Sequence, residues 1–587
     1  LAQDEDIYEL PLENLLDIEI TSVSKGAEKV STAAAAIYVI TQEDIKRSGV
    51  TSIPEALRMA PGIHVARISS SQWAITARGF NRQFSNKLLV LMDGRTIYSP
   101  LFSGVLWDVQ DTAIEDIERI EVIRGPGGTL WGANAVNGVI NIITKNAKDT
   151  NGTLVSLAAG DHDKSITTVR QGQEIGDNTH MRVYAKHAET NGLKKTDGTD
   201  EEGDWLMSRS GFRMDKEISP GETITFQGDV YSGDRDSSLF IPTTTAGVTT
   251  PQEGGEFLKG GNILTKWSTK RSASEETIVQ AYIDISHRDQ PLLEVKNTTF
   301  DFDIQDRFKI NDRNEVVYGA GFRQISESLN DSAFLNYTPD RRNDSIFSAF
   351  AQDKYTIIPD TLFFTFGSKF EKNEYTGFEY QPNVRASWLI DDQQSAWAAI
   401  SRAVRTPSRG EDGLVLRIGG FGGVAFVTQA GNTNIQSEEL IAYELGYKVA
   451  PKQNISIDVT GFFNDYTNLR TFEGTGLSRV ADNKGFGESY GVELNTDWQV
   501  NRNWKLAGGY SYFNLTLHRL PDSTDTLFFE PEENNSPHNL LNVRSYYSFP
   551  NRISWDNSTY FVDNLKGSTN VDSYWRYDSR IGWQVYD

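Results

Sequence analysis

The sequence has no cysteine among its 587 residues. No disulfide bond can therefore form, which suits a protein exposed to an oxidising compartment such as the periplasm. The absence of cysteine does not by itself identify that compartment.

Basic residues are also scarce, since 57 Lys and Arg stand against 80 Asp and Glu and the formal net charge is −23. This balance argues against nucleic acid as a partner, because phosphate binding requires clustered Lys and Arg. The seven His residues have no metal-ligand spacing, and neither HExxH nor GxSxG occurs. We therefore expect no cofactor, no bare metal ion bound by side chains and no enzyme active site.

Long apolar runs are missing too. A membrane-spanning helix needs ~20 apolar residues, and the longest runs here, residues 33–40 and 88–92, are far shorter. A transmembrane β-barrel is compatible with this, because its strands carry apolar residues only at alternate positions. The first residues, Leu1, Ala2 and Gln3, do not resemble a signal peptide, so we interpret the chain as mature or nearly mature. The alternative is a cytoplasmic protein without a signal.

From about residue 152 onward, short segments alternate between apolar and polar side chains. Tyr443, Leu445 and Tyr447, for example, alternate with Glu444 and Gly446. This period of two predicts antiparallel strands with one apolar face. A β-sandwich or a propeller would alternate in the same way, but the repeat of about 40–50 residues expected of propeller blades is not found. Aromatic residues cluster at segment ends, as in the girdles of a transmembrane barrel. At ~20 residues per strand, the segment predicts about 20–21 strands.

Polar stretches interrupt these segments at one end of the predicted strands. We expect extracellular loops at residues 190–205, 232–262, 328–345, 408–437 and 517–538. The opposite connections are short, for example Pro359-Asp360 and Asp391-Asp392, and are expected to be periplasmic turns.

Residues 120–145 form the most informative stretch, IEVIRGPGGTLWGANAVNGVINIITK, which indicates a strand, a glycine turn and a second strand. The glycine turn lacks a following Gly-Lys-Ser/Thr step and GxGxxG spacing, so a phosphate site is not expected. An ordered series of further motifs lies upstream. These are Ile37-Tyr38-Val39-Ile40-Thr41-Gln42-Glu43-Asp44-Ile45, Ile53-Pro54-Glu55-Ala56-Leu57, Pro61-Gly62-Ile63, Arg78-Gly79-Phe80, Leu91-Met92-Asp93-Gly94, Ile117-Glu118-Arg119-Ile120-Glu121-Val122 and Arg124-Gly125-Pro126.

The whole series resembles the plug domain of TonB-dependent outer-membrane receptors over about residues 15–150. Segments such as Phe350-Ala351-Gln352-Asp353 and residues 401–408 and 439–447 resemble barrel segments of the same family. The resemblance implies an all-β transmembrane barrel with an N-terminal α+β plug domain in its lumen. It implies residues 1–29 as an N-terminal extension with a TonB box, 30–150 as the plug and 151–587 as the barrel.

The family barrel has 22 strands and ends in an aromatic-terminated strand, whereas this sequence stops at Asp587 after a strand-like segment at residues 574–586. We therefore expect a barrel truncated at its C-terminus, with about two strands missing. The barrel sheet should then have a gap beside the first barrel strand, near residues 153–160.

The resemblance also implies TonB-dependent active uptake of a scarce chelate across the bacterial outer membrane, and a ferric siderophore is the commonest family ligand. Cobalamin, another metal chelate or an oligosaccharide would use the same mechanism. A passive porin and an adhesin or phage receptor are alternatives from other classes. Haem receptors of the family tend to use His ligands in the plug and in an outer loop. Haem is disfavoured here, since only His64 lies in the plug and His518 near a late loop. Expected partners are the inner-membrane protein TonB, outer-membrane lipid and the chelated ligand, with the receptor a monomer.

Three sets of site residues follow. The best TonB-box match is Ile18, Glu19, Ile20, Thr21, Ser22 and Val23, whose β-branched content suits pairing as an added strand, although an ordinary short strand is the alternative. The family's plug–barrel latch corresponds to Arg78, Arg124, Glu444 and Glu493, against the alternative of unrelated surface charges. Ligand contacts are expected from Ser69, Ser71, Gln72, Trp73, Phe84, Tyr98, Phe102 and Trp107.

Overall fold

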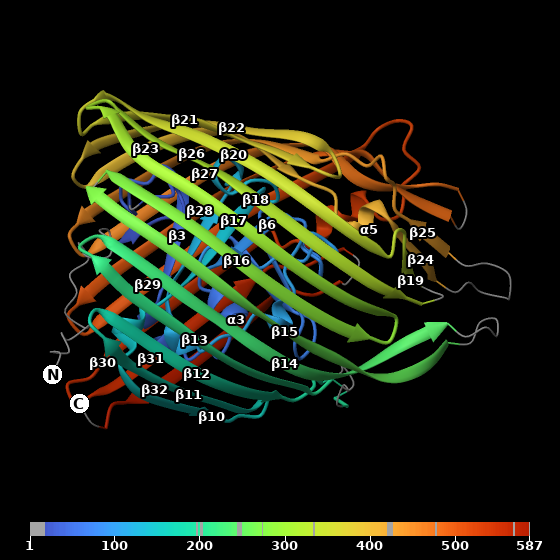
Figure 1. Ribbon diagram of the computed structural model, residues 1–587, viewed down its shortest axis with the longest axis horizontal. Helices are drawn as coiled ribbons and strands as arrows, with labels where there is room; N and C mark the ends of the chain where they lie inside the picture. Colours follow the sequence, from blue (N-terminus) through green and yellow to red (C-terminus); the bar gives the residue numbers. More distant parts are fainter. Residues whose placement is uncertain are drawn as a thin grey trace.

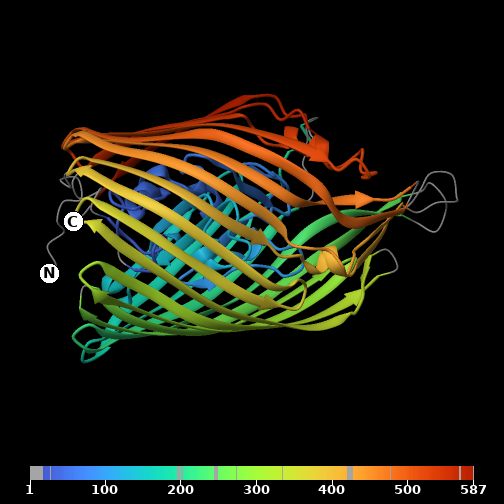
Figure 2. The same cartoon turned by 90° about the horizontal axis from the view of Figure 1, so that it is seen from above.

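The computed structural model describes residues 18–585 except 27, 195–197, 200–202, 243–248, 273, 333–334, 419–426, 476–477 and 568–569. A large barrel of tilted strands encloses a small domain formed by the N-terminal part of the chain (Figures 1 and 2). Among the described residues, no helix is long and apolar enough to cross a membrane. The arrangement confirms the expected fold class, an N-terminal plug inside a β-barrel.

The barrel wall is one antiparallel sheet in which neighbouring strands follow each other along the chain. Within the described residues its sheet contains 23 strands, of which the short β19, β24 and β25 lie in connections, which leaves 20 in the wall. The wall strands are β10 (Gly152–Ala158), β11 (Asp163–Gly176), β12 (Thr179–Thr190), β13 (Trp205–Ser219), β14 (Glu222–Pro242), β15 (Thr249–Ser272), β16 (Glu275–Gln290), β17 (Leu293–Asn311), β18 (Asn314–Asp331), β20 (Arg341–Ile358), β21 (Leu362–Asn373), β22 (Gly377–Asp391), β23 (Gln394–Arg405), β26 (Glu438–Lys452), β27 (Ile455–Glu473), β28 (Ser478–Asn501), β29 (Trp504–Arg519), β30 (Asn539–Ser548), β31 (Ile553–Val562) and β32 (Tyr574–Trp583).

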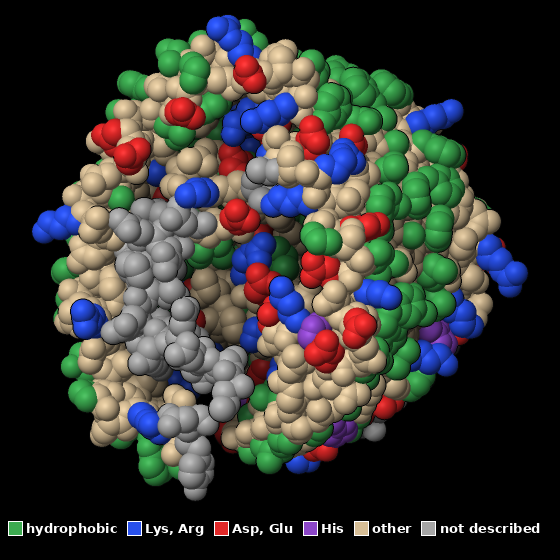
Figure 3. All heavy atoms as spheres, turned by 60° about the vertical axis from the view of Figure 1, so that its left-hand side comes forward, with side chains coloured by type: hydrophobic (Ala, Val, Ile, Leu, Met, Phe, Trp, Pro, Cys, Tyr) green, Lys and Arg blue, Asp and Glu red, His purple; other side chains and the backbone are tan. Residues whose placement is uncertain are grey.

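Side chains alternate across the wall as the period of two predicts. On β26, Tyr443, Leu445 and Tyr447 lie on the exposed outer surface, whereas Lys448 points inward and is buried. Because successive strand residues face opposite sides of a sheet, one face of the wall is apolar and the other is polar. Figure 3 shows apolar side chains gathered over one flank of the molecule, as a lipid-facing surface requires.

The two ends of the barrel differ in their connections. At one end the strands are joined by short turns, such as residues 220–221 between β13 and β14 and residues 312–313 between β17 and β18. This end carries both chain termini (Figure 1), and short turns are typical of the periplasmic side. The opposite end carries the long connections, which hold β19 (Leu335–Tyr337), α5 (Arg409–Asp412), β24 (Leu414–Ile418), β25 (Val427–Ala430) and η6 (Glu530–Asn535).

Two of the expected loops are mainly strand. Residues 232–262 belong largely to β14 and β15, which stay paired out to Pro242 and Thr249, and β18, β19 and β20 together occupy most of residues 328–345. Their polar composition suggested loops, but ladder pairing satisfies the backbone groups whether or not the side chains are apolar. Strands that continue beyond the bilayer can therefore be polar on both faces.

The plug is an α+β domain around a five-stranded sheet with strand order β3-β8-β9-β6-β7. Its apolar core includes Ile40, Leu57, Ile120 and Ile140, all fully buried. Its elements, with the preceding hairpin, are β1 (Glu19–Ile20), β2 (Glu28–Lys29), β3 (Ala36–Thr41), α2 (Gln42–Ser48), α3 (Ile53–Leu57), β4 (Ile63–Arg67), β5 (Trp73–Ala77), β6 (Leu88–Met92), β7 (Arg95–Thr96), η2 (Trp107–Val109), η3 (Ile114–Asp116), β8 (Ile117–Arg124), α4 (Gly128–Trp131), β9 (Gly138–Thr144) and η4 (Ala147–Thr150).

The wall sheet begins at β10 and ends at β32, and no pairing joins these two strands among the described residues. Residues of β11 and β32, with plug residues 48–58, border the space between them. The structure therefore has the gap expected beside the first barrel strand. That a longer chain would fill it stays a prediction.

Candidate functional site

The four residues assigned to the latch lie in one buried cluster between plug and wall. Arg78 contacts both glutamates: its Nη1 lies 2.8 Å from Glu444 Oε1, and its Nε lies 3.1 Å from Glu493 Oε1. Nη2 of Arg78 donates to Glu493 Oε2 at 3.1 Å, which makes that pair bidentate. Arg124 Nε lies 3.6 Å from Glu493 Oε2. Each of the four side chains is at most 6% exposed.

Local backbone geometry brings the two arginines together. Arg78 follows β5 with a φ of 52°, and Gly79 after it has a φ of 100°, so the chain turns sharply at this point. Arg124 ends β8, and Gly125 after it has a φ of 95°. A Cβ on Gly125 would collide with Glu444 Oε1, so glycine is required there both for the turn and for the close approach of the barrel glutamate.

Burial makes this cluster sensitive to the loss of either sign of charge. The guanidinium of Arg78 also lies over the Phe462 ring, 4.0 Å from its centroid. Removing one partner from a buried ion pair costs about 3–5 kcal/mol, because the remaining charge is left without compensation. The cluster therefore joins the plug to the wall through buried, charge-compensated contacts.

The structure adds plug–barrel ion pairs that the sequence did not reveal. Arg47 on α2 lies 2.6 Å from Asp556 on β31, and Glu55 on α3 lies 2.6 Å from Arg576 on β32. Further pairs join Arg82 to Glu532, Lys87 to Glu438 and Arg95 to Asp284. The inward parity of the barrel members is readable from the alternation, but their plug partners are not, because hundreds of residues separate them.

The segment assigned to the TonB box is folded against the plug at the short-turn end. Glu19–Ile20 form β1, which pairs with β2 (Glu28–Lys29). The backbone N–H groups of Thr21 and Ser22 donate to the buried carboxylate of Glu121 at 3.2 and 3.1 Å. Trp131 Nε1 donates to the Ser22 carbonyl at 2.8 Å.

Apolar packing completes this docking. Ile20 is fully buried and Val23 nearly so, in a cluster that Ile18 packs against. The segment thus contains a short strand in this conformation. Its backbone groups are already bonded to β2 and to Glu121. Residues 1–17 of the expected N-terminal extension lie outside the described residues.

Seven of the eight expected ligand contacts line a single cavity of about 180 Å³ on the long-connection side, here called the outer cavity. They are Ser71, Gln72, Trp73, Phe84, Tyr98, Phe102 and Trp107. Ser69 does not line it; its Oγ instead accepts from the Gln72 backbone N–H at 3.2 Å. Phe84 and Phe102 pack with ring centroids 4.7 Å apart. The plug side of the cavity is therefore aromatic with a few polar groups, as in small-molecule sites.

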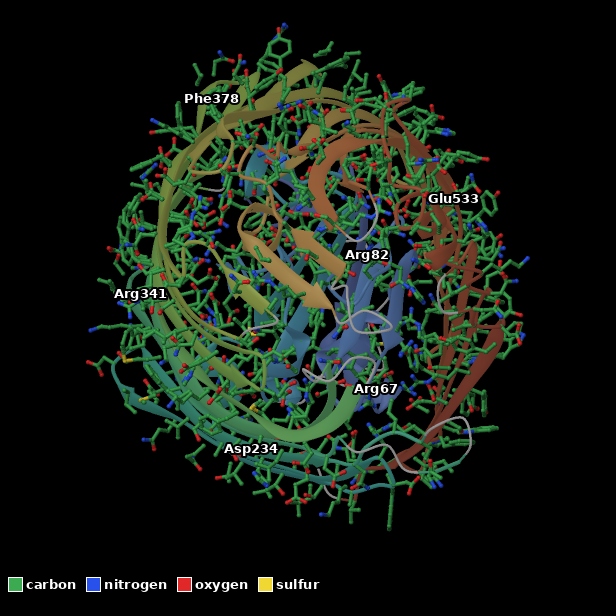
Figure 4. All side chains as sticks on the ribbon, turned by 90° about the vertical axis from the view of Figure 1, so that its right-hand side faces the viewer. Arg67, Arg82, Asp234, Arg341, Phe378 and Glu533 are labelled. Carbon is green, nitrogen blue, oxygen red and sulfur yellow. The ribbon has the colours of Figure 1, made fainter. Side chains whose placement is uncertain are left out.

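The barrel side of the outer cavity was not found from the sequence. Its polar and charged residues come from β13 to β18 and include Arg209, Tyr231, Tyr282, Asp284, Arg288, Asn297, Arg323 and Glu327. The alternation predicts their inward orientation, but many other inward residues share it. Figure 4 looks into the molecule from this end, with Arg67 and Arg82 of the plug inside the wall that carries Asp234 and Arg341.

A second cavity, of about 560 Å³, continues along the plug from the outer cavity. Thr96, Tyr98, Pro100, Arg323 and Ile325 line both cavities. The second cavity reaches Ser268, Lys270 and Glu276, near the ends of β15 and β16, and also touches Thr21 of the docked N-terminal segment. Together, the two cavities therefore extend along one side of the plug from the long-connection end toward the short-turn end.

The connection between β23 and β26 folds inward onto the plug. Arg409 N donates to the Pro100 carbonyl at 3.1 Å and Gly410 N to the Leu101 carbonyl at 2.9 Å. Glu411, in the same α5 turn, lies 2.7 Å from Arg405 and 2.8 Å from Arg470. Burial raises the pKa of Glu411, but the charges of Arg405 and Arg470 outweigh burial and bring that pKa down to about 2.

The two imidazoles considered for haem lie in unsuitable places. His64 on β4 is buried in the plug, and burial together with the charge of Arg58 lowers its pKa to about 4. His518, on β29, packs against the ring of Phe486 on β28. Neither imidazole lines the outer cavity.

Comparison with protein families covers both parts of this architecture. A model described as "TonB dependent receptor-like, beta-barrel" matches residues 145–587, and one described as "TonB-dependent Receptor Plug Domain" matches residues 29–139. The barrel match alone spans well over half of the chain.

Several characterised proteins are similar at low identity. The chain is 22% identical over 529 residues to an iron-regulated outer membrane virulence protein of Vibrio cholerae, covering 84% of this chain and 77% of that protein. It is 23% identical over 639 residues to the ferric enterobactin receptor PirA of Pseudomonas aeruginosa, covering 95% and 84%. The vitamin B12 transporter BtuB of Vibrio vulnificus is 22% identical over 525 residues, covering 85% and 83%.

Solved structures share the fold. The siderophore receptor PirA from Acinetobacter baumannii superposes with a TM-score of 0.76 at 16% identity, covering 94% of this chain and 92% of that one. The ferric enterobactin receptor PfeA of Pseudomonas aeruginosa gives 0.75 at 17% identity, covering 97% and 93%. With a lipid-facing barrel, an internal plug and both family models matched, the chain is a bacterial outer-membrane protein that belongs to the TonB-dependent receptor family.

Proposed function

We propose that this receptor takes up a ferric siderophore across the outer membrane by TonB-dependent active transport. The observation that carries the proposal is the separation of two sites by an ion-paired plug. An aromatic outer cavity faces the long connections, and a β-branched N-terminal segment lies at the short-turn end. Relatives named as iron-regulated or siderophore receptors support iron as the cargo.

The N-terminal segment would act as the handle that TonB pulls. In the docked state its backbone N–H groups at Thr21 and Ser22 are bound to Glu121. Pairing with a TonB strand needs free backbone groups, so the segment must first leave Glu121 and the β2 edge. We infer the extension as residues 1–29, the plug as 30–150 and the barrel as 151–587.

The latch would keep the plug in place until TonB pulls on the N-terminal segment. It consists of Arg78, Arg124, Glu444 and Glu493. Ion pairs in a shielded lumen are directional, so a small displacement of the plug weakens several contacts at once. The cargo would then pass from the outer cavity to the second cavity along the plug, past Tyr98 and Arg323.

A transporter accounts for this chain better than an enzyme, a porin or an adhesin. A passive porin has no use for a plug joined to the wall by buried ion pairs. An adhesin or phage receptor has no use for a docked N-terminal strand. We therefore infer that the chain is no enzyme and that it works as a monomer with TonB.

Cobalamin is the second candidate cargo, because relatives named vitamin B12 transporter match at similar identity. Uptake of radiolabelled iron and of labelled cobalamin by cells that depend on this receptor separates the two. We expect iron uptake that collapses when the proton gradient is dissipated. Cobalamin uptake without siderophore uptake would overturn the assignment of iron, and uptake that survives loss of the gradient would overturn active transport.

A further inference from the structure

The charge of the outer cavity limits the kind of chelate that it can bind. Among the described residues, four arginines line it, Arg95, Arg209, Arg288 and Arg323, together with His287, whose Nε2 lies 2.8 Å from Glu294 Oε1. A site for a polyanion would offer such residues unpaired, because burying a charge is unfavourable unless an opposite charge meets it.

Each of the four guanidinium groups already faces a carboxylate. Arg288 Nη2 lies 2.7 Å from Asp108 and its Nη1 lies 3.6 Å from Glu256. Arg323 Nε lies 2.7 Å from Asp301. Arg95 is paired with Asp284, and Arg209 with Asp229.

Basic residues next to the cavity are engaged as well. Arg409 is paired with Glu327 at 2.8 Å, and Arg235 with Glu256. Arg67 does not line the cavity; it donates to the backbone carbonyls of Ser69 and Ser70 and its guanidinium lies over the Trp73 ring. Between residues 190 and 480, Lys195 is the sole basic residue outside the described part.

Four polar atoms of the described cavity residues lack a hydrogen-bond partner: Arg209 Nε, the Tyr282 hydroxyl, Asn297 Oδ1 and Glu327 Oε2. Arg209 Nε can only donate, but its guanidinium group already faces Asp229. The free oxygens of Asn297 and Glu327 can only accept, so they favour N–H or ammonium groups of a ligand and oppose a further anionic oxygen. The aromatic rings of Phe102 and Trp107 suit apolar or cationic ligand parts.

We propose that the outer cavity selects ferric chelates that carry no net negative charge, such as uncharged or monocationic tris-hydroxamate complexes, over trianionic tris-catecholates. This inference rests on the proposed function, because it names the chelate class for the same site. It separates this chain from relatives named as ferric enterobactin receptors.

The direct test is binding to purified full-length receptor in detergent, followed by fluorescence of tryptophans such as Trp73 and Trp107. The probes are the iron(III) complexes of enterobactin, of an uncharged cyclic tris-hydroxamate and of desferrioxamine B, together with cyanocobalamin. We expect both hydroxamate complexes to bind at least about tenfold more tightly than ferric enterobactin. Their affinity should also change little between low and high salt.

The outcomes that contradict the inference are distinct from those that contradict the proposed function. Tightest binding of ferric enterobactin overturns the charge selectivity while leaving siderophore uptake in place. Binding of cyanocobalamin alone overturns siderophore uptake itself, and the chelate class with it.

Two variants locate the selectivity in the cavity. Glu327→Gln and Asp108→Asn each remove one negative charge that faces an arginine, so each should weaken the monocationic complex and strengthen ferric enterobactin several-fold. Unchanged binding of the uncharged complex shows that the cavity remains intact. Glu315→Gln, at the other end of β18 and outside both cavities, is the matched control. If Glu315→Gln shifts the three complexes as much as Glu327→Gln does, the selectivity is a long-range effect and the proposal is wrong.

Discussion

At the scale of single residues, buried charged side chains of the plug and the wall contact each other. Glu493 accepts from Arg78 twice and faces Arg124, and its side chain is only 2% exposed. Glu488, on the same strand, points to the outer surface instead. The two glutamates therefore separate the effect of the buried cluster from that of charge alone.

We expect Glu493→Gln to loosen the plug, because two guanidinium groups lose their shared carboxylate. The cost should be about 3–5 kcal/mol in the stability of plug seating. Limited proteolysis of the plug in the folded barrel measures it, with Glu488→Gln as the control. Equal cleavage rates in the two variants would contradict the latch.

Glu411 should make the stability of the α5 segment depend on pH. Its pKa is about 2 in the folded state and about 4.3 in an unfolded chain. A depressed carboxyl pKa adds stability that is complete above about pH 4.3 and is lost as the pH falls toward about 2. We expect hydrogen exchange in residues 406–418 to accelerate over that window. Glu411→Gln should exchange faster at neutral pH and lack the transition, whereas Glu530→Gln, in another connection, should keep it.

At the scale of elements, the β1 segment and the α5 turn contact the plug from opposite ends. β1 is held by backbone bonds to Glu121 and by burial of Ile20, and α5 by backbone bonds to Pro100 and Leu101. Pro100 also borders both cavities. A ligand in the outer cavity would therefore touch the same plug loop that α5 contacts.

Deleting residues 18–23 should abolish energised uptake while leaving ligand binding near normal, because the segment lies outside the outer cavity. A milder variant, Ile20→Pro, removes one backbone N–H and should also block strand pairing. Ile20→Val keeps the β-branched side chain and serves as its control. Transport that persists after the deletion would refute the assignment of the TonB box.

At the scale of the whole molecule, the barrel has to place its apolar surface in lipid. Leu445 lies in the middle of β26 and is 65% exposed on the outer face, between Tyr443 and Tyr447. The buried Glu444 beside it faces the lumen and binds Arg78. A shift of one residue in register would exchange these environments.

Leu445→Arg should therefore reduce barrel stability by about 2–4 kcal/mol, the usual cost of arginine on the lipid face near the bilayer centre. Urea titration of the receptor folded into lipid vesicles measures this. Leu520→Arg, an exposed position in the connection after β29, should cost much less. A similar loss for both variants would place β26 outside the bilayer.

The alternation of side chains along each strand is local information, and from it the sequence alone determined antiparallel strands with one apolar face, the inward parity of Glu444 and Glu493, and a strand number near 20. The barrel class came from the resemblance of an ordered series of motifs to a known family. Local motifs likewise identified the plug and seven of the plug residues that line the outer cavity. The tertiary structure decided which charges meet, because Arg78 and Glu493 are 415 residues apart and Arg47 and Asp556 are 509 apart. It also showed that polar residues 232–262 continue as strands, since ladder pairing depends on a neighbouring strand and not on composition. Arg95 and Arg288 meet their carboxylates only when plug and wall close around the same space. Arg209 and Arg323 pair with carboxylates on neighbouring wall strands. Both kinds of pairing depend on which elements are neighbours, so no local pattern could reveal them.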